Sequence, residues 1–138
     1  MMQDQLTGGC LCGKVRYEAK TPYRSVHYCH CSMCRKATGS PFETLIWFPL
    51  KAVKWTATLP KTYQSSKIAE RGFCADCGTP LFLQYKVPHR CAHEIALTVG
   101  SLDNPEDTVP EYHYGVESRL PWIDCSKGLP EKETQERL

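Results

Sequence analysis

The sequence predicts an all-β protein, and three observations support this prediction. Short runs rich in β-branched and aromatic residues recur along the 138 residues, separated by turn signals. Ten prolines and nine glycines punctuate the chain between these runs. No segment has the amphipathic pattern of a helix of three turns. The length suits one domain, which we expect to span residues 1–138 with a C-terminal tail from about residue 125.

Six strands and one short helix are expected. In chain order the strands are residues 15–19 (VRYEA), 43–48 (ETLIWF), 61–65 (KTYQS), 80–85 (PLFLQY), 94–99 (EIALTV) and 111–116 (EYHYGV). The helix is SMCRKATG, where Ser32 can cap the N-terminus and Gly39 can end the helix. The charged end EKETQERL is expected to be a frayed tail or a short helix.

Charge and hydropathy exclude two classes of partner. The formal net charge is +2, from 17 Lys and Arg against 15 Asp and Glu, and the basic residues are scattered along the chain. This distribution gives no basic stripe for a nucleic-acid partner. The start MMQDQLTGG lacks the features of a secretory signal, and no apolar run approaches the roughly 18 residues of a membrane span. We therefore expect no membrane partner and a cytoplasmic location.

The cysteines are the most informative feature of the composition. Nine cysteines are many for a domain in a reducing compartment, where metal binding or catalysis explains them better than disulfides do. An odd number also leaves one thiol over if all the others pair. Seven of them form three tight groups, whereas Cys91 and Cys125 stand alone. Such grouping indicates metal ligation, and the two isolated residues are most simply buried thiols.

Two of the groups end in glycine and resemble the two halves of one metal site. They are CLCG, with Cys10 and Cys12, and CADCG, with Cys74 and Cys77. A glycine there can adopt the positive φ that turns backbone N–H groups toward bound thiolates, and cations such as Lys14 and Arg71 can offset the thiolate charge. Together the two halves predict a structural zinc site. The alternative is that either pair is merely a pair of buried thiols.

The third group, CHCSMC, brings three cysteines into six residues without an obvious fourth ligand. Cys29, Cys31 and Cys34 can converge on one ion with little loss of chain entropy. Candidates for a fourth ligand are His27, His30, His89, His93, His113, Cys91 and Glu43, and no spacing singles one out. The group is therefore an open or exchangeable site, a closed four-ligand site, or a metal-free thiol cluster.

An open zinc with three thiolates suits thiol chemistry. Its negative charge makes it a weak Lewis acid and a poor generator of hydroxide, and a soft thiol is a better fourth ligand than water. Zinc lowers the pKa of a bound thiol and keeps it as a thiolate, which can attack an aldehyde. Arg35 and Lys36 can attract anionic groups of a thiol substrate, or they form an ordinary solvated basic surface.

The motifs resemble one known family over nearly the whole chain. They are GGCLCGKVRY, CHCSMCRKATGS, the WFP at 47–49, the YQSS at 63–66, RGFCADCGTPLF, VGSLDNP and HYGVESRLPW, in that order. The chain is similar to the glutathione-dependent formaldehyde-activating enzymes and to their relatives in the centromere protein V group. The resemblance implies an all-β fold built as a tent-like stack of small antiparallel sheets, with zinc-binding loops.

The resemblance also implies two zinc ions and a reaction. Cys10, Cys12, Cys74 and Cys77 would hold a structural zinc, and Cys29, Cys31 and Cys34 would hold a second, catalytic zinc. In the named enzyme that second site joins glutathione to formaldehyde. The expected activity here is that of a carbon–sulfur lyase, with a small glutathione-like thiol and a small aldehyde as its partners.

Two other functions remain open from the sequence. Both zinc ions can be structural, in a binding module without catalytic activity. Alternatively, Cys29, Cys31 and Cys34 can form a thiol redox device whose low-pKa sulfurs exchange disulfides. His113 lies in an alternating strand pattern, which favours a structural histidine over a catalytic one.

Overall fold

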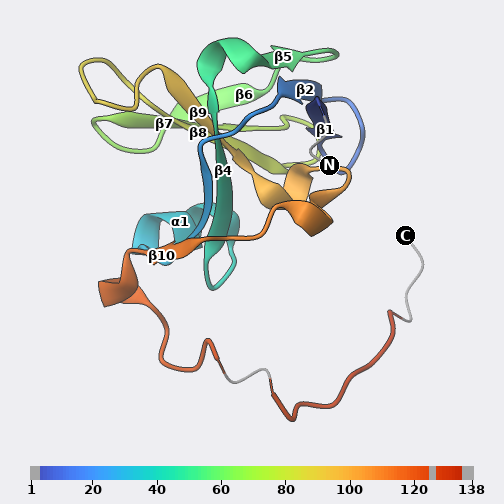
Figure 1. Ribbon diagram of the computed structural model, residues 1–138, viewed down its shortest axis with the longest axis vertical. Helices are drawn as coiled ribbons and strands as arrows, with labels where there is room; N and C mark the ends of the chain where they lie inside the picture. Colours follow the sequence, from blue (N-terminus) through green and yellow to red (C-terminus); the bar gives the residue numbers. More distant parts are fainter. Residues whose placement is uncertain (1–3, 125–126, 135–138) are drawn as a thin grey trace.

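Ten strands, one α-helix and four short 3₁₀ helices make up the computed structural model, which describes residues 4–124 and 127–134. Strands dominate, so the predicted all-β class is confirmed, with one helical insertion. The strands form two sheets, and the C-terminal segment runs away from both of them (Figure 1). In the described part of the chain, no helix is long and apolar enough to cross a membrane.

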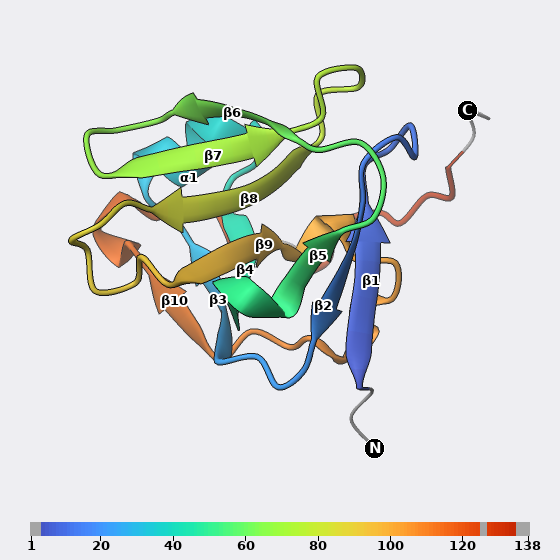
Figure 2. The same cartoon turned by 90° about the horizontal axis from the view of Figure 1, so that it is seen from above.

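The smaller sheet has three antiparallel strands in the order β1-β2-β5 (Figure 2). They are β1 (Gln5–Gly9), β2 (Arg16–Lys20) and β5 (Val53–Trp55). Tyr17 of β2 is buried, with its ring edge-on to that of Trp55 at a centroid distance of 5.5 Å. Its hydroxyl lies 2.7 Å from Oγ of Ser101, which satisfies both polar groups inside the core.

The larger sheet has seven strands in the order β10-β3-β4-β9-β8-β7-β6. They are β3 (Ser25–Cys29), β4 (Glu43–Pro49), β6 (Lys61–Gln64), β7 (Ala69–Phe73), β8 (Pro80–Tyr85), β9 (Glu94–Thr98) and β10 (Tyr112–Tyr114). All neighbours are antiparallel except β10 and β3, which are parallel. The 3₁₀ helices are η1 (Leu50–Ala52), η2 (Val99–Ser101), η3 (Pro105–Asp107) and η4 (Val116–Ser118).

The helix α1 (Ser32–Thr38) connects β3 to β4 and lies at one end of both strands (Figure 1). Gly39 ends it in the left-handed conformation with φ 69°, as predicted. The predicted cap at Ser32 is wrong, because Ser32 is already helical. Cys31 is the N-cap, and its Sγ accepts a hydrogen bond from the backbone N–H of Cys34. Cys31, a candidate metal ligand, therefore caps the helix in the way that a serine hydroxyl usually does.

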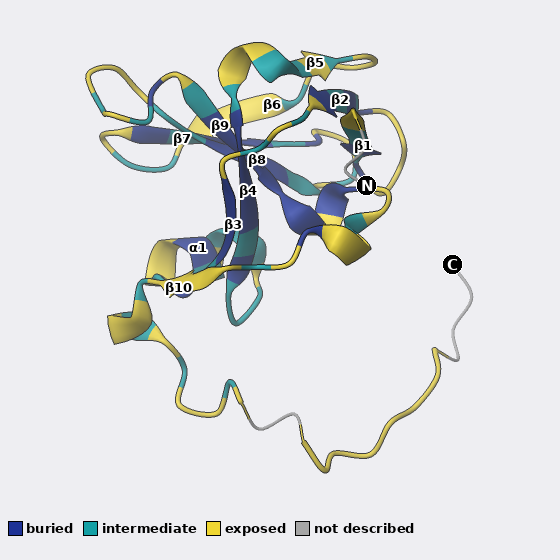
Figure 3. Ribbon diagram, viewed as in Figure 1, coloured by how far each residue is buried: buried dark blue, intermediate teal, exposed yellow. Residues whose placement is uncertain are grey.

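Strand β4 divides the core between the two faces of the larger sheet. Because side chains alternate along a strand, Ile46 and Phe48 pack on one face, together with Tyr17 of the smaller sheet. Leu45 and Trp47 pack on the opposite face, with a second set of buried residues that includes two cysteines of CHCSMC. The strands around β4 are the most buried part of the molecule (Figure 3). The second face carries the cavity described below.

The six predicted strands correspond to β2, β4, β6, β8, β9 and β10. Strands β1, β3, β5 and β7 were not predicted. Of the predicted tail, Cys125 and residues 126 and 135–138 lie outside the described residues. Residues 127–134 are exposed and belong to no helix or strand.

Candidate functional site

The first cysteine cluster joins two loops that are far apart in the sequence. The Sγ atoms of Cys10, Cys12, Cys74 and Cys77 all lie within 4.8 Å of one another. Those of Cys12 and Cys74 are 3.8 Å apart, although the residues are 62 positions apart. One pair follows β1 of the smaller sheet and the other follows β7 of the larger sheet. Four thiols so placed match the donor set of a tetrahedral structural zinc site, which would tie the two sheets together.

The loops around this cluster turn as the sequence predicted. Gly13 and Gly78, the glycines that end CLCG and CADCG, have φ of 82° and 81°. Only glycine adopts this region without strain. After the first turn, the backbone N–H of Val15 donates to Sγ of Cys10 over 3.3 Å. The two glycines therefore let the chain fold back on its own sulfurs.

Neighbouring polar groups favour the thiolate form of Cys77 in the first cluster. The hydroxyl of Thr79 lies 3.2 Å from Sγ of Cys77. Hydrogen bonds from this hydroxyl and from the Thr79 backbone lower the pKa of the Cys77 thiol to about 5. Lys14 also lies near the cluster, where it forms an ion pair with Asp76 at 3.3 Å. Since the thiolate is the metal-binding form, these contacts prepare the cluster for a cation.

The second cluster consists of the three cysteines of CHCSMC. Cys29 is the last residue of β3, Cys31 caps α1, and Cys34 lies in its first turn. Their Sγ atoms lie within 4.8 Å of one another, and those of Cys29 and Cys31 are 3.4 Å apart. The strand end and the helix start together position three sulfurs on a short segment. The convergence expected from the spacing is therefore present.

None of the seven candidates for a fourth ligand joins these three sulfurs. Among the described residues, no other Cys, His, Asp or Glu offers a ligand atom within 4.8 Å of all three. Nε2 of His30 lies 2.8 Å from Nδ1 of His113 instead. Glu43 accepts a hydrogen bond from Arg71, and His93 is exposed. The cluster thus offers three protein ligands and leaves a fourth position free in the described chain.

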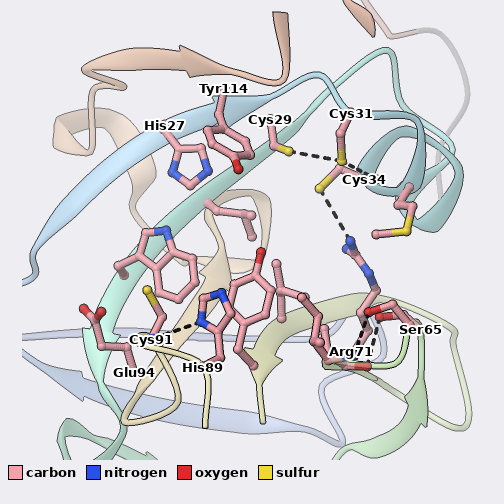
Figure 4. A pocket seen from close by; sticks show the side chains of 18 of the residues that line it. His27, Cys29, Cys31, Cys34, Ser65, Arg71, His89, Cys91, Glu94 and Tyr114 are labelled. Atoms are coloured by element: carbon pink, nitrogen blue, oxygen red, sulfur yellow. Dashed lines mark hydrogen bonds between the residues drawn. The ribbon is translucent and has the colours of Figure 1, made fainter. Parts of the chain in front are cut away.

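The three sulfurs line a cavity of about 550 Å³ (Figure 4). This volume is in the range of cavities that bind small organic molecules. The other lining residues are Arg24, His27, Met33, Leu45, Trp47, Ser65, Ser66, Ile68, Ala69, Arg71, Leu83, Tyr85, His89, Arg90, Cys91, Glu94, Tyr112 and Tyr114. The second core face of the larger sheet therefore forms the floor of the cavity, with the sulfurs exposed to it.

Aromatic rings form a nearly parallel row along this cavity. The order is Tyr112, His27, Trp47, Tyr85 and His89, with angles of 7°, 12°, 6° and 13° between successive ring planes. The centroids of Tyr85 and His89 are 4.0 Å apart, and the others are 5.0 to 6.4 Å apart. Offset stacking of this kind fixes the rings and gives the cavity a rigid, largely apolar wall.

His27 stays neutral in this wall. Burial, and then the charge of Arg24, lower the pKa of His27 to about 4. Its Nδ1 is buried and has no hydrogen-bond partner among the described residues. The imidazole therefore contributes a neutral ring to the cavity at pH 7.

Arg71 connects the second cluster to a buried carboxylate. Its Nη1 donates to Oε1 of Glu43 over 3.0 Å, and its Nη2 lies 3.5 Å from Sγ of Cys34. The side chains of Arg71 and Glu43 are only 6% and 4% exposed. A hydrogen bond with Cys29, together with burial, raises the pKa of the Cys34 thiol. A nearby cation is thus needed for the thiolate, and Arg71 supplies one.

The structure places two predicted binding residues outside the cavity. Arg35 and Lys36 were expected to attract a thiol substrate, but neither is among the residues that line it. Arg35 donates from Nη1 to the backbone oxygen of Ser118 over 3.4 Å. Lys36 lines a smaller hollow that shares Met33, Ser65 and Arg71 with the cavity. The attraction of a thiol substrate by Arg35 and Lys36 stays a prediction.

Three other cations among the described residues line the cavity. Arg71 was expected at the first cluster and lies at the second one, while Arg24 and Arg90 line the cavity without having been predicted. No spacing marks these residues, because Arg71 lies on β7, Arg24 directly precedes β3, and Arg90 lies in the loop between β8 and β9. Cys91 was expected to be a buried thiol, but it is only partly buried and lines the cavity.

A mainly β domain with a four-cysteine cluster and an open three-cysteine cluster defines the class of protein. The sequence profile of the family described as "Glutathione-dependent formaldehyde-activating enzyme" matches residues 5–118. The chain belongs to this family. The resemblance found in the sequence motifs is therefore confirmed.

Individual relatives agree with this assignment. A Schizosaccharomyces pombe protein named as an uncharacterized lyase is 36% identical over 78 residues, which are 56% of each chain. A Colletotrichum graminicola protein named "Putative glutathione-dependent formaldehyde-activating enzyme" is 34% identical over 65 residues, 46% of this chain and 34% of that protein. The matched segments thus span about half or less of these relatives.

A solved structure supports the fold. A crystal structure of a Rhodobacter sphaeroides protein matches with a TM-score of 0.62 and 23% identity, covering 78% of this chain and 99% of that chain. The arrangement of sheets is therefore shared with an experimentally determined structure.

Proposed function

We propose that this protein is a zinc-dependent carbon–sulfur lyase that adds a small thiol to a small aldehyde at Cys29, Cys31 and Cys34. The observation that carries the proposal is the three-sulfur cluster, which has no fourth ligand among residues 4–124 and 127–134 and opens into a cavity of about 550 Å³. Membership of the formaldehyde-activating family supports glutathione and formaldehyde as the substrate classes.

The two clusters fit zinc with different roles. Four thiolates make a closed site, and closed sites are structural, whereas three protein ligands with an open position are typical of catalytic zinc. Cys10, Cys12, Cys74 and Cys77 would therefore hold the structural ion, and Cys29, Cys31 and Cys34 the catalytic one. At the open site, zinc would lower the pKa of an incoming thiol so that it is a thiolate at neutral pH.

The chain's own residues would prepare the site for this addition. Arg71 offsets the negative charge of the thiolates from within 3.5 Å of Cys34, and Glu43 holds Arg71 in place. The apolar wall around Trp47 excludes water, which strengthens these electrostatic contacts. The reacting groups of the substrate would thus lie between the charge of Arg71 and this apolar wall.

The proposed reaction forms one carbon–sulfur bond. The thiolate sulfur attacks the carbonyl carbon, the carbonyl π electrons move to oxygen, and the resulting alkoxide takes up a proton. Burial raises the pKa of Tyr85, so its hydroxyl stays protonated at neutral pH and is one proton source in the cavity. Reversal of these steps gives cleavage of the adduct, the lyase direction.

Formation of the adduct can be followed directly. Carbon-13 formaldehyde and glutathione are mixed, and the rate at which the hydroxymethyl thioether appears is measured by NMR with and without the zinc-loaded protein. We expect acceleration by the native protein and none by Cys31→Ser. A binding module with two structural zinc ions would give no acceleration with either protein. A redox device would instead form mixed disulfides with oxidised glutathione, whether or not aldehyde is present.

A further inference from the structure

We propose that Arg24 and Glu94 bind the α-amino carboxylate end of the thiol substrate, which makes the cavity selective for a thiol that carries this group at a peptide-length distance from its sulfur. The inference rests on the proposed function, because it assumes that the sulfur of this thiol enters the three-cysteine cluster. It adds the residues that distinguish one class of thiol from another.

Arg24 and Glu94 lie at the far end of the cavity from the sulfurs. Arg24 directly precedes β3 and Cys29 ends it, so the two are about 16 Å apart along an extended strand. Strand β4 gives a second estimate, because its first residue, Glu43, pairs with Cys29 and its last residue, Pro49, pairs with Glu94. The length of β4 therefore separates Cys29 from Glu94 by about 20 Å. Figure 4 shows Glu94 and the three cysteines on opposite sides of the cavity.

The two side chains form a fixed pair of opposite charges. Nε of Arg24 donates to Oε2 of Glu94 over 2.6 Å, and the guanidinium carbon lies 5.0 Å from the centroid of the Trp47 ring. These contacts set the plane of the guanidinium. Nη1 is 3.5 Å from Oγ of Ser25, at the limit of a hydrogen bond. The terminal nitrogens therefore keep donors for a carboxylate, and Glu94 keeps an oxygen for an ammonium group.

A zwitterion fits this pair better than a single charge does. An α-amino carboxylate carries a carboxylate and an ammonium group on one carbon, so it can contact the Arg24 guanidinium and the Glu94 carboxylate at once. The side chains are 47% and 23% exposed, so both remain accessible. A partly exposed ion pair contributes little to folding stability, so stability is a weak reason for its presence.

The distance along the cavity sets the length of the ligand. Free cysteine has its sulfur only two bonds from its α-carbon and cannot reach both ends. A peptide of two or three residues spans about 7–11 Å, and the side chains of Arg24 and the cysteines, which line the cavity, cover the remainder. The wall of His27, Trp47 and Tyr85 runs between the two ends and would pack against the spacer. Glutathione, with its γ-glutamyl end, has these properties.

The test compares thiols by calorimetry, without aldehyde. Zinc-loaded native protein, Arg24→Gln and Glu94→Gln are each titrated with glutathione, cysteine and 2-mercaptoethanol. We expect each substitution to weaken glutathione binding about tenfold or more and 2-mercaptoethanol binding by less, since one charge-assisted hydrogen bond is lost. Arg16→Gln removes a comparable partly exposed ion pair, that with Asp103 on the smaller sheet, and should leave all three affinities unchanged.

The result that overturns the inference is a constant ratio of glutathione to 2-mercaptoethanol affinity across the native protein and both variants. Equal affinity of the native protein for all three thiols would also overturn it. Glutathione binding that depends on Arg24, without any adduct in the formaldehyde assay, would contradict the proposed reaction and leave the inference standing. In the adduct assay itself, the two variants should raise KM for glutathione far more than they lower kcat.

Discussion

Nη2 of Arg71 lies 3.5 Å from Sγ of Cys34, inside the protein and on the face of the larger sheet that carries the cavity. Arg71 comes from β7 and Cys34 from α1, so the contact links the cysteine segment to the opposite part of the sheet. The same guanidinium binds Glu43 on β4. Because both charges are almost fully buried, each is left without compensation if the other is removed; burial raises the pKa of Glu43, and the charge of Arg71 opposes that rise.

Removal of Arg71 should therefore be strongly destabilising. Arg71→Gln leaves the buried carboxylate of Glu43 without its cation, which costs about 3–5 kcal/mol. The free energy of unfolding from urea denaturation measures the loss. Arg16→Gln, which removes the partly exposed pair with Asp103, should cost less than about 1 kcal/mol. Equal losses in the two variants would mean that the Arg71–Glu43 pair is not a buried, mutually dependent unit.

The two cysteine clusters should respond differently to substitution. Cys74→Ser removes a ligand of the cluster that joins the two sheets, and structural zinc is worth about 10–16 kcal/mol in small peptides, more than the usual net stability of a domain. We expect this variant to be unfolded by circular dichroism. Cys31→Ser should keep the native spectrum and lose adduct formation. If both variants unfold alike, the division into a structural and a catalytic cluster is wrong.

The buried phenol of Tyr17 predicts a loss of stability in base. Burial raises the pKa of Tyr17 to about 12, above the ordinary value of 10.0. The unfolded chain therefore releases this proton first, and stability falls by about 1.4 kcal/mol per pH unit as the pH rises from 10 to 12. Tyr17→Phe loses the contact with Ser101, so it is less stable at pH 8. The difference in the free energy of unfolding between the native protein and Tyr17→Phe should shrink as the pH rises and reverse by pH 12. A difference that stays constant with pH would contradict the prediction.

Close packing around Gly72 predicts that a larger residue at this position destabilises the fold. A Cβ atom at this position would lie 2.0 Å from a ring carbon of Phe82, on the neighbouring strand β8. Gly72→Ala must displace that ring and should cost about 1–3 kcal/mol in thermal or urea unfolding. Gly100→Ala is the control, because nothing lies within 4 Å of its added Cβ. A Gly72→Ala protein as stable as the control would show that the ring moves freely.

The part of the fold that followed from the sequence is the part with strong local patterns. Runs such as ETLIWF and PLFLQY are strands because their residues favour a pleated, buried surface. Strand β7 (AERGF) was missed because its Glu and Arg resemble a polar loop, whereas Arg71 is buried by a partner on another strand. Strand β3 (SVHYC) was missed because its end was assigned to the metal motif. Tertiary pairing, rather than propensity, decides these two strands.

In the candidate site, too, the sequence predicted the residues with a local pattern and missed those that tertiary structure brings together. The sequence predicted both cysteine clusters, because short spacings limit where the sulfurs can go, and the positive φ at Gly13 followed from the same motifs. It did not predict the cavity residues Arg24 or Tyr85, since strand order alone brings them near the sulfurs. The assignment of Arg35 to the substrate relied on sequence proximity and stays a prediction; in the structure its Nη1 donates to the backbone oxygen of Ser118.

Native mass spectrometry of the reduced protein, before and after addition of glutathione, tests the open three-cysteine centre most directly. We expect two zinc ions per chain in the native protein and one in Cys31→Ser, with glutathione retained only on the two-zinc form. A second zinc ion that ignores glutathione, or a native protein that binds only one zinc ion, would contradict an open, thiol-accepting site at Cys29, Cys31 and Cys34.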